Sequence, residues 1–176
     1  MRRLNKKGDY ITMARKLLKI KNPEIFQINF AGRITDRNPN GRRQFSWKIP
    51  TDELAEQLKA DGWNVWYTKE SEKYGESRPC IDVEIRYHQE KELQYLNPKI
   101  YKVTSKKKTL LTEDLVADLE KDEIIDIDLW INPSYWNVNG KSGIKAYVDT
   151  MWITVEEDDT IEKYAHLDEV EELPFA

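Results

Sequence analysis

The sequence of 176 residues is short of the residues that form disulfides and soft-metal sites: it has one cysteine, Cys80, and two histidines, His88 and His166. A single cysteine allows no disulfide framework within the chain, which makes a reducing compartment the default expectation. The cysteine and the histidines do not form a zinc-binding pattern. Because a glycine-rich phosphate-binding loop is missing as well, we expect neither a metal ion nor a cofactor.

Long apolar segments are also missing. No stretch approaches the roughly 18 uninterrupted apolar residues that cross a bilayer. Residues 1–7 are basic, but the apolar segment that follows the basic start of a signal peptide does not come after them. These two absences lead us to expect a soluble protein of the cytoplasm.

The net charge of −4 conceals a separation of charge along the chain. Residues 1–48 contain thirteen Lys and Arg against three acids, whereas residues 156–172 contain nine acids and one base. Ends of opposite sign predict a polyanionic partner for the basic part and a regulatory or interaction role for the acidic part. Ordinary solvated surface is the alternative interpretation.

Alternating apolar and polar residues predict a folded, mainly β domain, although 34% of the residues are charged. Strands are predicted over 24–30, 44–49, 63–67, 81–87, 98–103, 124–131 and 144–155. Short helices are predicted over 51–61 and 112–120, with Thr51 and Thr112 as caps. Residues 10–20 form either a short helix or an extended arm, and residues 132–143 are expected to be a loop. Short strands separated by turns indicate a small barrel or sandwich.

Several aromatic residues lie out of phase with the apolar face of their predicted strands. Trp130 and Tyr147 share a face with charged residues, and Trp152 is out of phase with the apolar Met151, Ile153 and Val155. A core does not explain such positions, but a platform on which nucleic-acid bases stack does, at roughly 1–3 kcal/mol per base. Helices or a partner subunit that cover this face would be the alternative explanation.

Other aromatic residues fit a core better. Phe26, Phe30, Phe45 and Trp47 alternate with polar residues and are predicted to be buried. In contrast, residues 63–67 place aromatic side chains on both faces of a strand.

Basic residues gather around two predicted hairpins, and in a small barrel such loops flank the binding face. Together with the aromatic pattern they predict a surface for single-stranded nucleic acid. It consists of Arg33, Arg42, Arg43, Lys48, Trp66, Lys99, Tyr101, Lys102, Lys106, Lys107, Trp130, Trp136, Lys145, Tyr147 and Trp152.

Two segments, FSWKIPTDELAEQLKADGWNV at 45–65 and WNVNGKSGIKAYVDTMWITV at 136–155, resemble bacteriophage single-stranded DNA-binding proteins with an oligonucleotide-binding (OB) fold. The stretch 99–110 is similar too, and the resemblance covers about residues 25–165. It implies an OB-fold-like five-stranded barrel with extra strands or hairpins. It also implies a non-enzymatic protein that coats single-stranded DNA during phage replication or recombination, in the host cytoplasm and without sequence specificity.

The end of the chain looks like the acidic tip of bacterial single-stranded DNA-binding proteins, which docks replication and repair enzymes. The resemblance implies a docking role for Asp168, Glu169, Glu171, Glu172, Leu173, Pro174 and Phe175. Carboxylates would steer the tip toward a basic pocket, and the Pro-Phe pair would fill an apolar hole. Ala176 departs from the pattern because it displaces the terminal carboxylate by one residue. A solubilising acidic tail is the alternative.

The predicted organisation is a basic arm over 1–22, an OB-fold single-stranded DNA-binding domain over 23–158 and a disordered acidic tail over 159–176. A homo-oligomer is compatible with it. Two other functions remain open at this point. One is a metal-dependent nuclease or recombination enzyme that uses Asp126, Asp128 and Glu84; the other is a protein–protein adaptor whose basic face binds an acidic partner.

Overall fold

The computed structural model describes residues 2–4, 10–12, 17–73 and 75–157, so the acidic tip lies outside the described residues. Its elements are β1 (Arg2–Leu4), β2 (Tyr10–Thr12), β3 (Leu18–Lys21), β4 (Glu24–Asn29), β5 (Arg43–Lys48), α1 (Asp52–Asp61), β6 (Trp66–Tyr67), β7 (Pro79–Ile85), the 3₁₀ helix η2 (Lys91–Leu96), β8 (Lys99–Val103), β9 (Lys108–Leu111), the 3₁₀ helix η3 (Val116–Lys121), β10 (Ile124–Val138) and β11 (Lys141–Val155). The predicted mainly β class is confirmed. Among these residues, no helix has the length and apolar character needed to cross a membrane.

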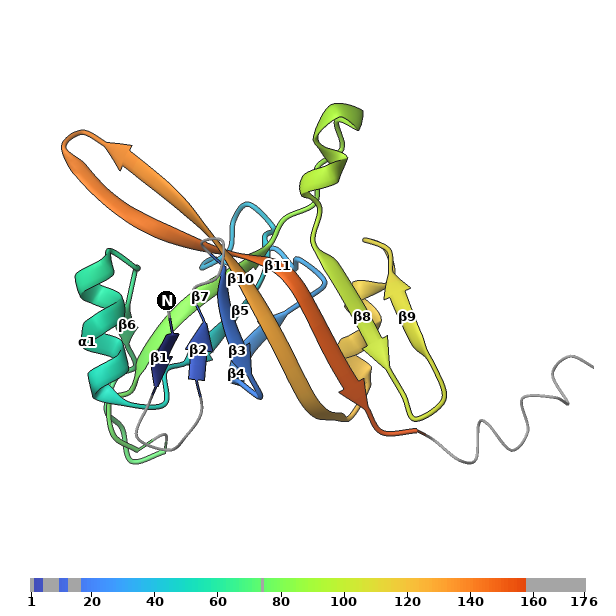
Figure 1. Ribbon diagram of the computed structural model, residues 1–176, viewed down its shortest axis with the longest axis horizontal. Helices are drawn as coiled ribbons and strands as arrows, with labels where there is room; N and C mark the ends of the chain where they lie inside the picture. Colours follow the sequence, from blue (N-terminus) through green and yellow to red (C-terminus); the bar gives the residue numbers. More distant parts are fainter. Residues whose placement is uncertain (1, 5–9, 13–16, 74, 158–176) are drawn as a thin grey trace, which may run out of the picture.

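The central strands follow the order β3-β10-β11-β7-β5-β4. Since only Asn22 and Pro23 separate β3 from β4, the two ends of this path belong to one bent segment. The pairing therefore forms a five-stranded barrel, in which β11 and β7 run parallel and the other pairs are antiparallel (Figure 1). The β8–β9 hairpin extends the sheet beyond the barrel, because β8 pairs in parallel with the last part of β11.

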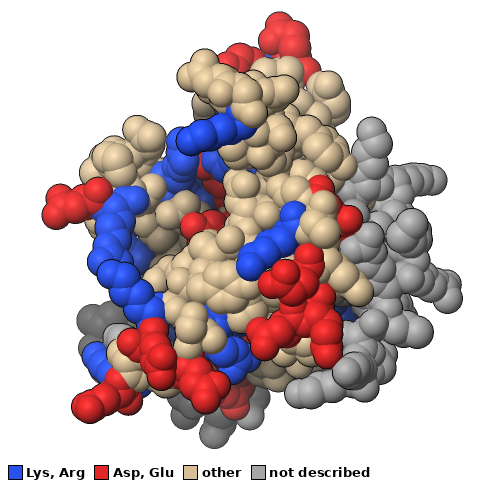
Figure 2. All heavy atoms as spheres, turned by 90° about the vertical axis from the view of Figure 1, so that its left-hand side faces the viewer, with Lys and Arg blue, Asp and Glu red and all other residues tan. Residues whose placement is uncertain are grey.

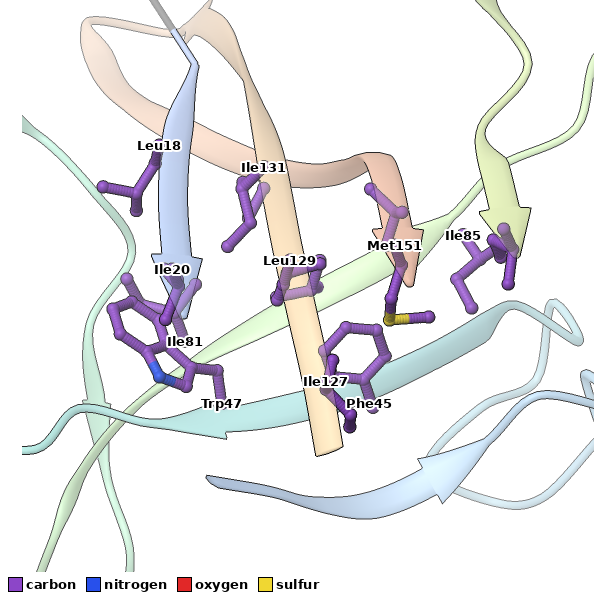
Figure 3. Packing of buried hydrophobic residues seen from close by; sticks show 14 of the residues in the cluster. Leu18, Ile20, Phe45, Trp47, Ile81, Ile85, Ile127, Leu129, Ile131 and Met151 are labelled. Atoms are coloured by element: carbon purple, nitrogen blue, oxygen red, sulfur yellow. The ribbon is translucent and has the colours of Figure 1, made fainter. Parts of the chain in front are cut away.

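The barrel interior contains the apolar residues of the alternating strands. Phe30, Phe45 and Trp47 are at most 1% exposed, which confirms them as core residues. They pack with the inward side chains of β3, β7, β10 and β11, such as Leu129 and Met151 (Figure 3). Burial of each such side chain contributes about 1.5–3 kcal/mol relative to exposure.

Helix α1 begins and ends where the sequence predicts. The Thr51 hydroxyl accepts a hydrogen bond from the Leu54 amide at 3.2 Å. Gly62 ends the helix with φ at 103°, in the left-handed region that glycine tolerates best. Leu54, Ala55 and Leu58 form the buried face and join the barrel core.

Residues 132–143 form a hairpin, so the predicted loop is wrong. Strand β10 continues to Val138, β11 starts at Lys141, and the two strands project beyond the barrel (Figure 1). The turn between them, Asn139-Gly140, has positive φ at both residues (52° and 78°). This conformation is typical of a two-residue hairpin turn, whose twist matches that of the strands. We name the projecting part, residues 132–145, the distal hairpin.

Three further sequence predictions need correction. Residues 18–21 belong to the barrel as β3, because Leu18 and Ile20 point into the core and β3 pairs with β10. The predicted helix over 112–120 is the shorter 3₁₀ helix η3, and Thr112 bonds to Asp114 instead of capping it. Of the predicted strand over 63–67, β6 pairs with β7, and Trp63 makes only an isolated bridge with Ile144.

Candidate nucleic-acid interface

The sequence pattern places Phe26 in the core, but a bulge in β4 turns its side chain outward. Gln27 has φ at 50°, and the pairing with β5 shifts register between Phe26 and Asn29. Bulges of this kind change the direction in which the side chains of a strand point. Ile25 consequently packs against the core, while the half-buried Phe26 ring lies 6.2 Å from the ring of Trp66.

Phe26 and Trp66 lie in a groove of about 810 Å³ between β4, β6 and the loop that joins β6 to β7. The residues that line it are Phe26, Gln27, Arg37, Lys48, Trp66, Tyr67, Thr68, Lys69, Ser71, Lys73 and Arg78. Among the described residues that line this groove there are three aromatic side chains, five Lys or Arg side chains and no Asp or Glu. Figure 2 looks onto the side with α1 and the distal hairpin, where Lys and Arg side chains follow one side of a hollow.

Hydrogen bonds fix the Trp66 ring at the wall of this groove. Its indole N–H donates to Oδ1 of Asp82 at 3.0 Å, and the Ser46 hydroxyl donates to the same oxygen at 2.7 Å. Beside them, the Lys48 ammonium lies 5.1 Å from the Phe26 ring centroid. The aromatic wall is therefore held in place by the barrel strands β4, β5 and β7.

A second bulge aligns the predicted aromatic residues of β11. Trp130 pairs with Thr150 but the next residue, Ile131, pairs with Val148, so Asp149 is an extra residue in β11. Without it, the odd-numbered Tyr147 and the even-numbered Trp152 would point to opposite faces. With it, both lie half-buried on the outer face.

Five side chains form a row across the outer face of β3, β10, β11, β8 and β9. The Lys19 ammonium lies 4.1 Å from the Trp130 ring centroid, and Trp130 meets Trp152 edge to face at 4.9 Å. Trp152 in turn stacks with Tyr101 at 6.0 Å, with 14° between the ring planes. The Lys108 ammonium lies 4.7 Å from the Tyr101 ring. We call this row, Lys19, Trp130, Trp152, Tyr101 and Lys108, the outer platform.

Other predicted basic residues bind partners within the protein. Arg33 donates to both carboxylate oxygens of Glu120, at 2.6 and 3.0 Å, which raises the pKa of Arg33. The remaining pairs are Lys102 with Asp122, Arg42 and Lys145 with Glu84, Arg43 with the Phe30 carbonyl and Glu113, and, at the groove itself, Lys48 with Glu24. The structure does not bring Arg33, Arg43 or Lys102 into the groove or the outer platform.

The other predicted residues are dispersed. Lys99 is exposed on β8, next to the outer platform, and Lys106 and Lys107 lie in the β8–β9 turn. Trp136 is in the distal hairpin, where it helps to line a hollow of about 310 Å³ next to the end of α1. Tyr147 lies under the Lys145 ammonium, 5.2 Å away, beside the Lys145–Glu84 pair.

Several groove and platform residues were absent from the predicted set. Lys69, Lys73 and Arg78 come from a polar loop whose sequence has no signal of its own. Lys19 could have been found, because it alternates with the apolar Leu18 and Ile20.

The acids considered for a nuclease do not meet. Asp126 and Asp128 share a face of β10, where burial of Asp128 and the neighbouring Asp126 raise the pKa of Asp128. Glu84 is two strands away, on β7, and pairs with Arg42 and Lys145. Within the described ranges, no three His, Cys, Asp or Glu residues gather as metal ligands would.

A small β-barrel with a basic, aromatic groove has the features of a protein that binds single-stranded nucleic acid. Comparison with protein families agrees: the family model described as "Putative phage ssDNA-binding domain" matches residues 9–175. The chain belongs to this family.

Two solved structures share the fold. The single-stranded DNA-binding protein from bacteriophage Enc34 in complex with ssDNA aligns with a TM-score of 0.53 and 9% identity, over 90% of this chain and 96% of that one. A further structure of the Enc34 protein aligns with a TM-score of 0.50 and 9% identity, over 90% and 92% of the two chains. A search of curated protein sequences finds no match.

Proposed function

We propose that the protein coats single-stranded DNA without sequence specificity during phage replication or recombination, and that the groove between β4 and β6 holds the strand. The observation that carries this proposal is that Phe26, Trp66 and Tyr67 line one open groove of about 810 Å³ together with five Lys and Arg side chains. Stacking supplies about 1–3 kcal/mol per base, and cationic side chains neutralise the phosphates.

The position of the groove also supports the proposal. Counted along the barrel, β5 and β7 are the second and third strands, and in an OB fold their face and the adjoining loops bind oligonucleotides. The groove adjoins this face, and Arg37 reaches it from the loop between the first and second strands. An OB-fold assignment of the barrel and a DNA-binding role of the groove therefore agree.

Lack of sequence specificity follows from the kind of side chain that lines the groove. Every base has a flat face, so stacking on Phe26 or Trp66 tolerates all four bases. The basic side chains of the groove are Lys and Arg on strand ends and loops, and such side chains suit contacts to phosphates. Oligo-dT, oligo-dC and oligo-dA should accordingly bind with affinities that differ much less than the affinities of single-stranded and duplex DNA.

Fluorescence anisotropy of labelled oligo-dT tests the role of the groove. Replacement of Trp66 by Ala should weaken binding about tenfold, the value of one lost stacking contact. Trp66→Phe, which keeps an aromatic face but loses the bond to Asp82, should retain most of the affinity. Tyr95→Ala is the matched control, because Tyr95 is 80% exposed on η2, outside the groove.

Salt dependence provides the second part of the test. Each phosphate neutralised on a single strand contributes about −0.7 to the slope of log affinity against log salt. Arg78→Ala should reduce the steepness by about that amount for every sequence alike. If Trp66→Ala binds as the unaltered protein does and Arg78→Ala keeps its slope, the groove is not the DNA site.

A further inference from the structure

The outer platform is a separate surface from the groove. It spans five strands, and its three rings contact one another in sequence with a lysine ammonium at each end. The opposite face of the same strands carries Ile127, Leu129 and Met151, which are at most 4% exposed and supply the core. The fold needs apolar residues on that inner face only, so core packing does not account for the aromatic row.

The β8–β9 hairpin completes the platform, although the barrel closes without it. Strand β8 pairs in parallel with β11, and the register sets Tyr101 opposite Trp152. Strand β9 then sets Leu110 opposite Tyr101 and brings Lys108 to the same face. The hairpin thus adds a third ring, Tyr101, and the Lys108 ammonium to the surface that Trp130 and Trp152 form on β10 and β11.

The charges on this face suit a polyanion. Four lysines, Lys19, Lys21, Lys99 and Lys108, share it with two acids, Asp126 and Asp128. The lysines stand on β3, β8 and β9, on either side of β10 and β11, whereas both acids are on β10, next to β3. Aromatic rings in the middle and ammonium groups along the sides are the arrangement that stacks bases and holds phosphates.

The outer face of β11 connects the platform with the groove side of the barrel. Tyr147, under the Lys145 ammonium, pairs with β7, and Trp152 lies four register positions further along the same strand, about 13 Å at roughly 3.3 Å per residue. The bulge at Asp149 keeps both rings on one face. A nucleic-acid strand that passes from the groove to the platform would therefore meet Tyr147 and Lys145 on the way, beside the acidic Glu84.

We propose that the outer platform is a second contact surface for single-stranded DNA, so that one protomer holds a strand at the groove and again at Trp130, Trp152 and Tyr101. This inference rests on the proposed function. It requires a binding site toward the upper end of the 4–16 nucleotides that one OB barrel covers.

A length series of oligo-dT, from about 4 to about 16 nucleotides, tests the inference. Trp152→Ala should bind the short oligonucleotides as the unaltered protein does and lose about tenfold in affinity for the long ones. Trp66→Ala should lose affinity at every length, because the groove is engaged first. Tyr95→Ala again serves as the control, with thermal unfolding to show that each variant is folded.

A variant that leaves the rings intact separates DNA contact from packing. The Lys19→Ala, Lys108→Ala double variant should show the same length-dependent loss and a salt slope lower by about 1.4 for long oligonucleotides only. Ultraviolet crosslinking should attach the long oligonucleotide to the peptides with Tyr101 or Trp152, and the short one to the peptide with Trp66.

Three results would overturn the second contact: no change at any length, an equal loss at every length, or a changed oligomeric state with unchanged DNA affinity. The last result would mean that a second copy covers the platform. Failure of the proposed function looks different, because the unaltered protein would then bind no oligonucleotide, or Trp66→Ala would have no effect on the short ones.

Discussion

Tyr101 and Trp152 stack with their ring centroids 6.0 Å apart and 14° between their planes, although they belong to strands joined by a long connection. The parallel register of β8 and β11 places the two residues opposite each other on the sheet. The pair therefore joins the added hairpin to the barrel, and its packing energy should be measurable.

A double-mutant cycle measures this packing. Tyr101→Leu and Trp152→Leu should each destabilise the fold, and the pair should show a coupling energy of about 0.5–1.5 kcal/mol. Denaturant unfolding of the four proteins gives the value. Additive effects, within about 0.3–0.5 kcal/mol, would mean that the stacked geometry contributes no coupling energy to the fold.

Deletion of residues 168–176 should leave affinity for single-stranded DNA equal or higher. The segment carries four acids, and a polyanion on the same chain competes with DNA for basic surfaces. The gain should be larger at low salt, where charges are less screened. Titration of both proteins with single-stranded DNA at two salt concentrations checks this. A variant with Glu169, Glu171 and Glu172 changed to Gln keeps the length of the segment and controls for the effect of its charge. A large loss of affinity would contradict the expectation.

Phe175→Ala should leave DNA affinity unchanged, because we propose that the tip serves protein partners. Phe175 is the apolar residue of the tip, while its acids provide the charge that affects DNA. Pull-down of replication proteins from phage-infected cells with both proteins would show which partners depend on this ring. A loss of DNA affinity in this variant would place the ring at the DNA surface instead.

The Asp128 carboxyl should make the fold more stable as pH falls. Burial and the nearby Asp126 raise its pKa, against the opposing effect of Lys21. A raised pKa in the folded state means that this state binds the proton more tightly than the unfolded chain. The stability that this group contributes is therefore fully present below the ordinary Asp pKa of about 3.9. It is lost as the pH rises from that value through the pKa of the folded state.

Asp128→Asn removes this dependence and should be at least as stable as the unaltered protein near neutral pH. Urea unfolding at several pH values between about 3.5 and 6 provides the comparison. Parallel stability profiles for the two proteins would show that Asp128 titrates alike in the folded and unfolded states.

Cys80 should resist thiol reagents in the native protein. Its side chain is fully buried in β7, and burial raises its pKa to about 11. The thiolate is the reactive form, so labelling at pH 8 should be slow in buffer and fast in denaturant. Labelling that is equally rapid in both solutions would contradict the buried position.

Local sequence patterns predicted much of the barrel because its elements follow simple rules. Helix α1 begins after Thr51 and ends at Gly62 as expected, and the side chains of Phe45 and Trp47 point into the core. The distal hairpin was missed because Pro133 and the Asn139-Gly140 pair resemble a loop. In fact Pro133 lies beyond the residues that pair with β3, and Asn-Gly is a preferred hairpin turn.

The site was harder to predict, since it depends on bulges and on distant pairing. The register shift at Gln27 moved Phe26 from the core to the groove, and the extra Asp149 aligned Tyr147 with Trp152. Periodicity cannot reveal either shift, because one inserted residue reverses the faces of a strand. The phase of Trp130 and Trp152 against their apolar neighbours was nevertheless visible and led to their common surface.

Titration of the intrinsic tryptophan fluorescence with oligo-dT at about 50 mM salt is the most direct test of the central claim. We predict saturable quenching, which weakens steeply as salt is raised. The quenching should shrink when Trp66 is replaced by Phe, since Trp66 lines the groove. Unchanged fluorescence together with no detectable binding at low salt would contradict the claim that this chain binds single-stranded DNA through aromatic side chains.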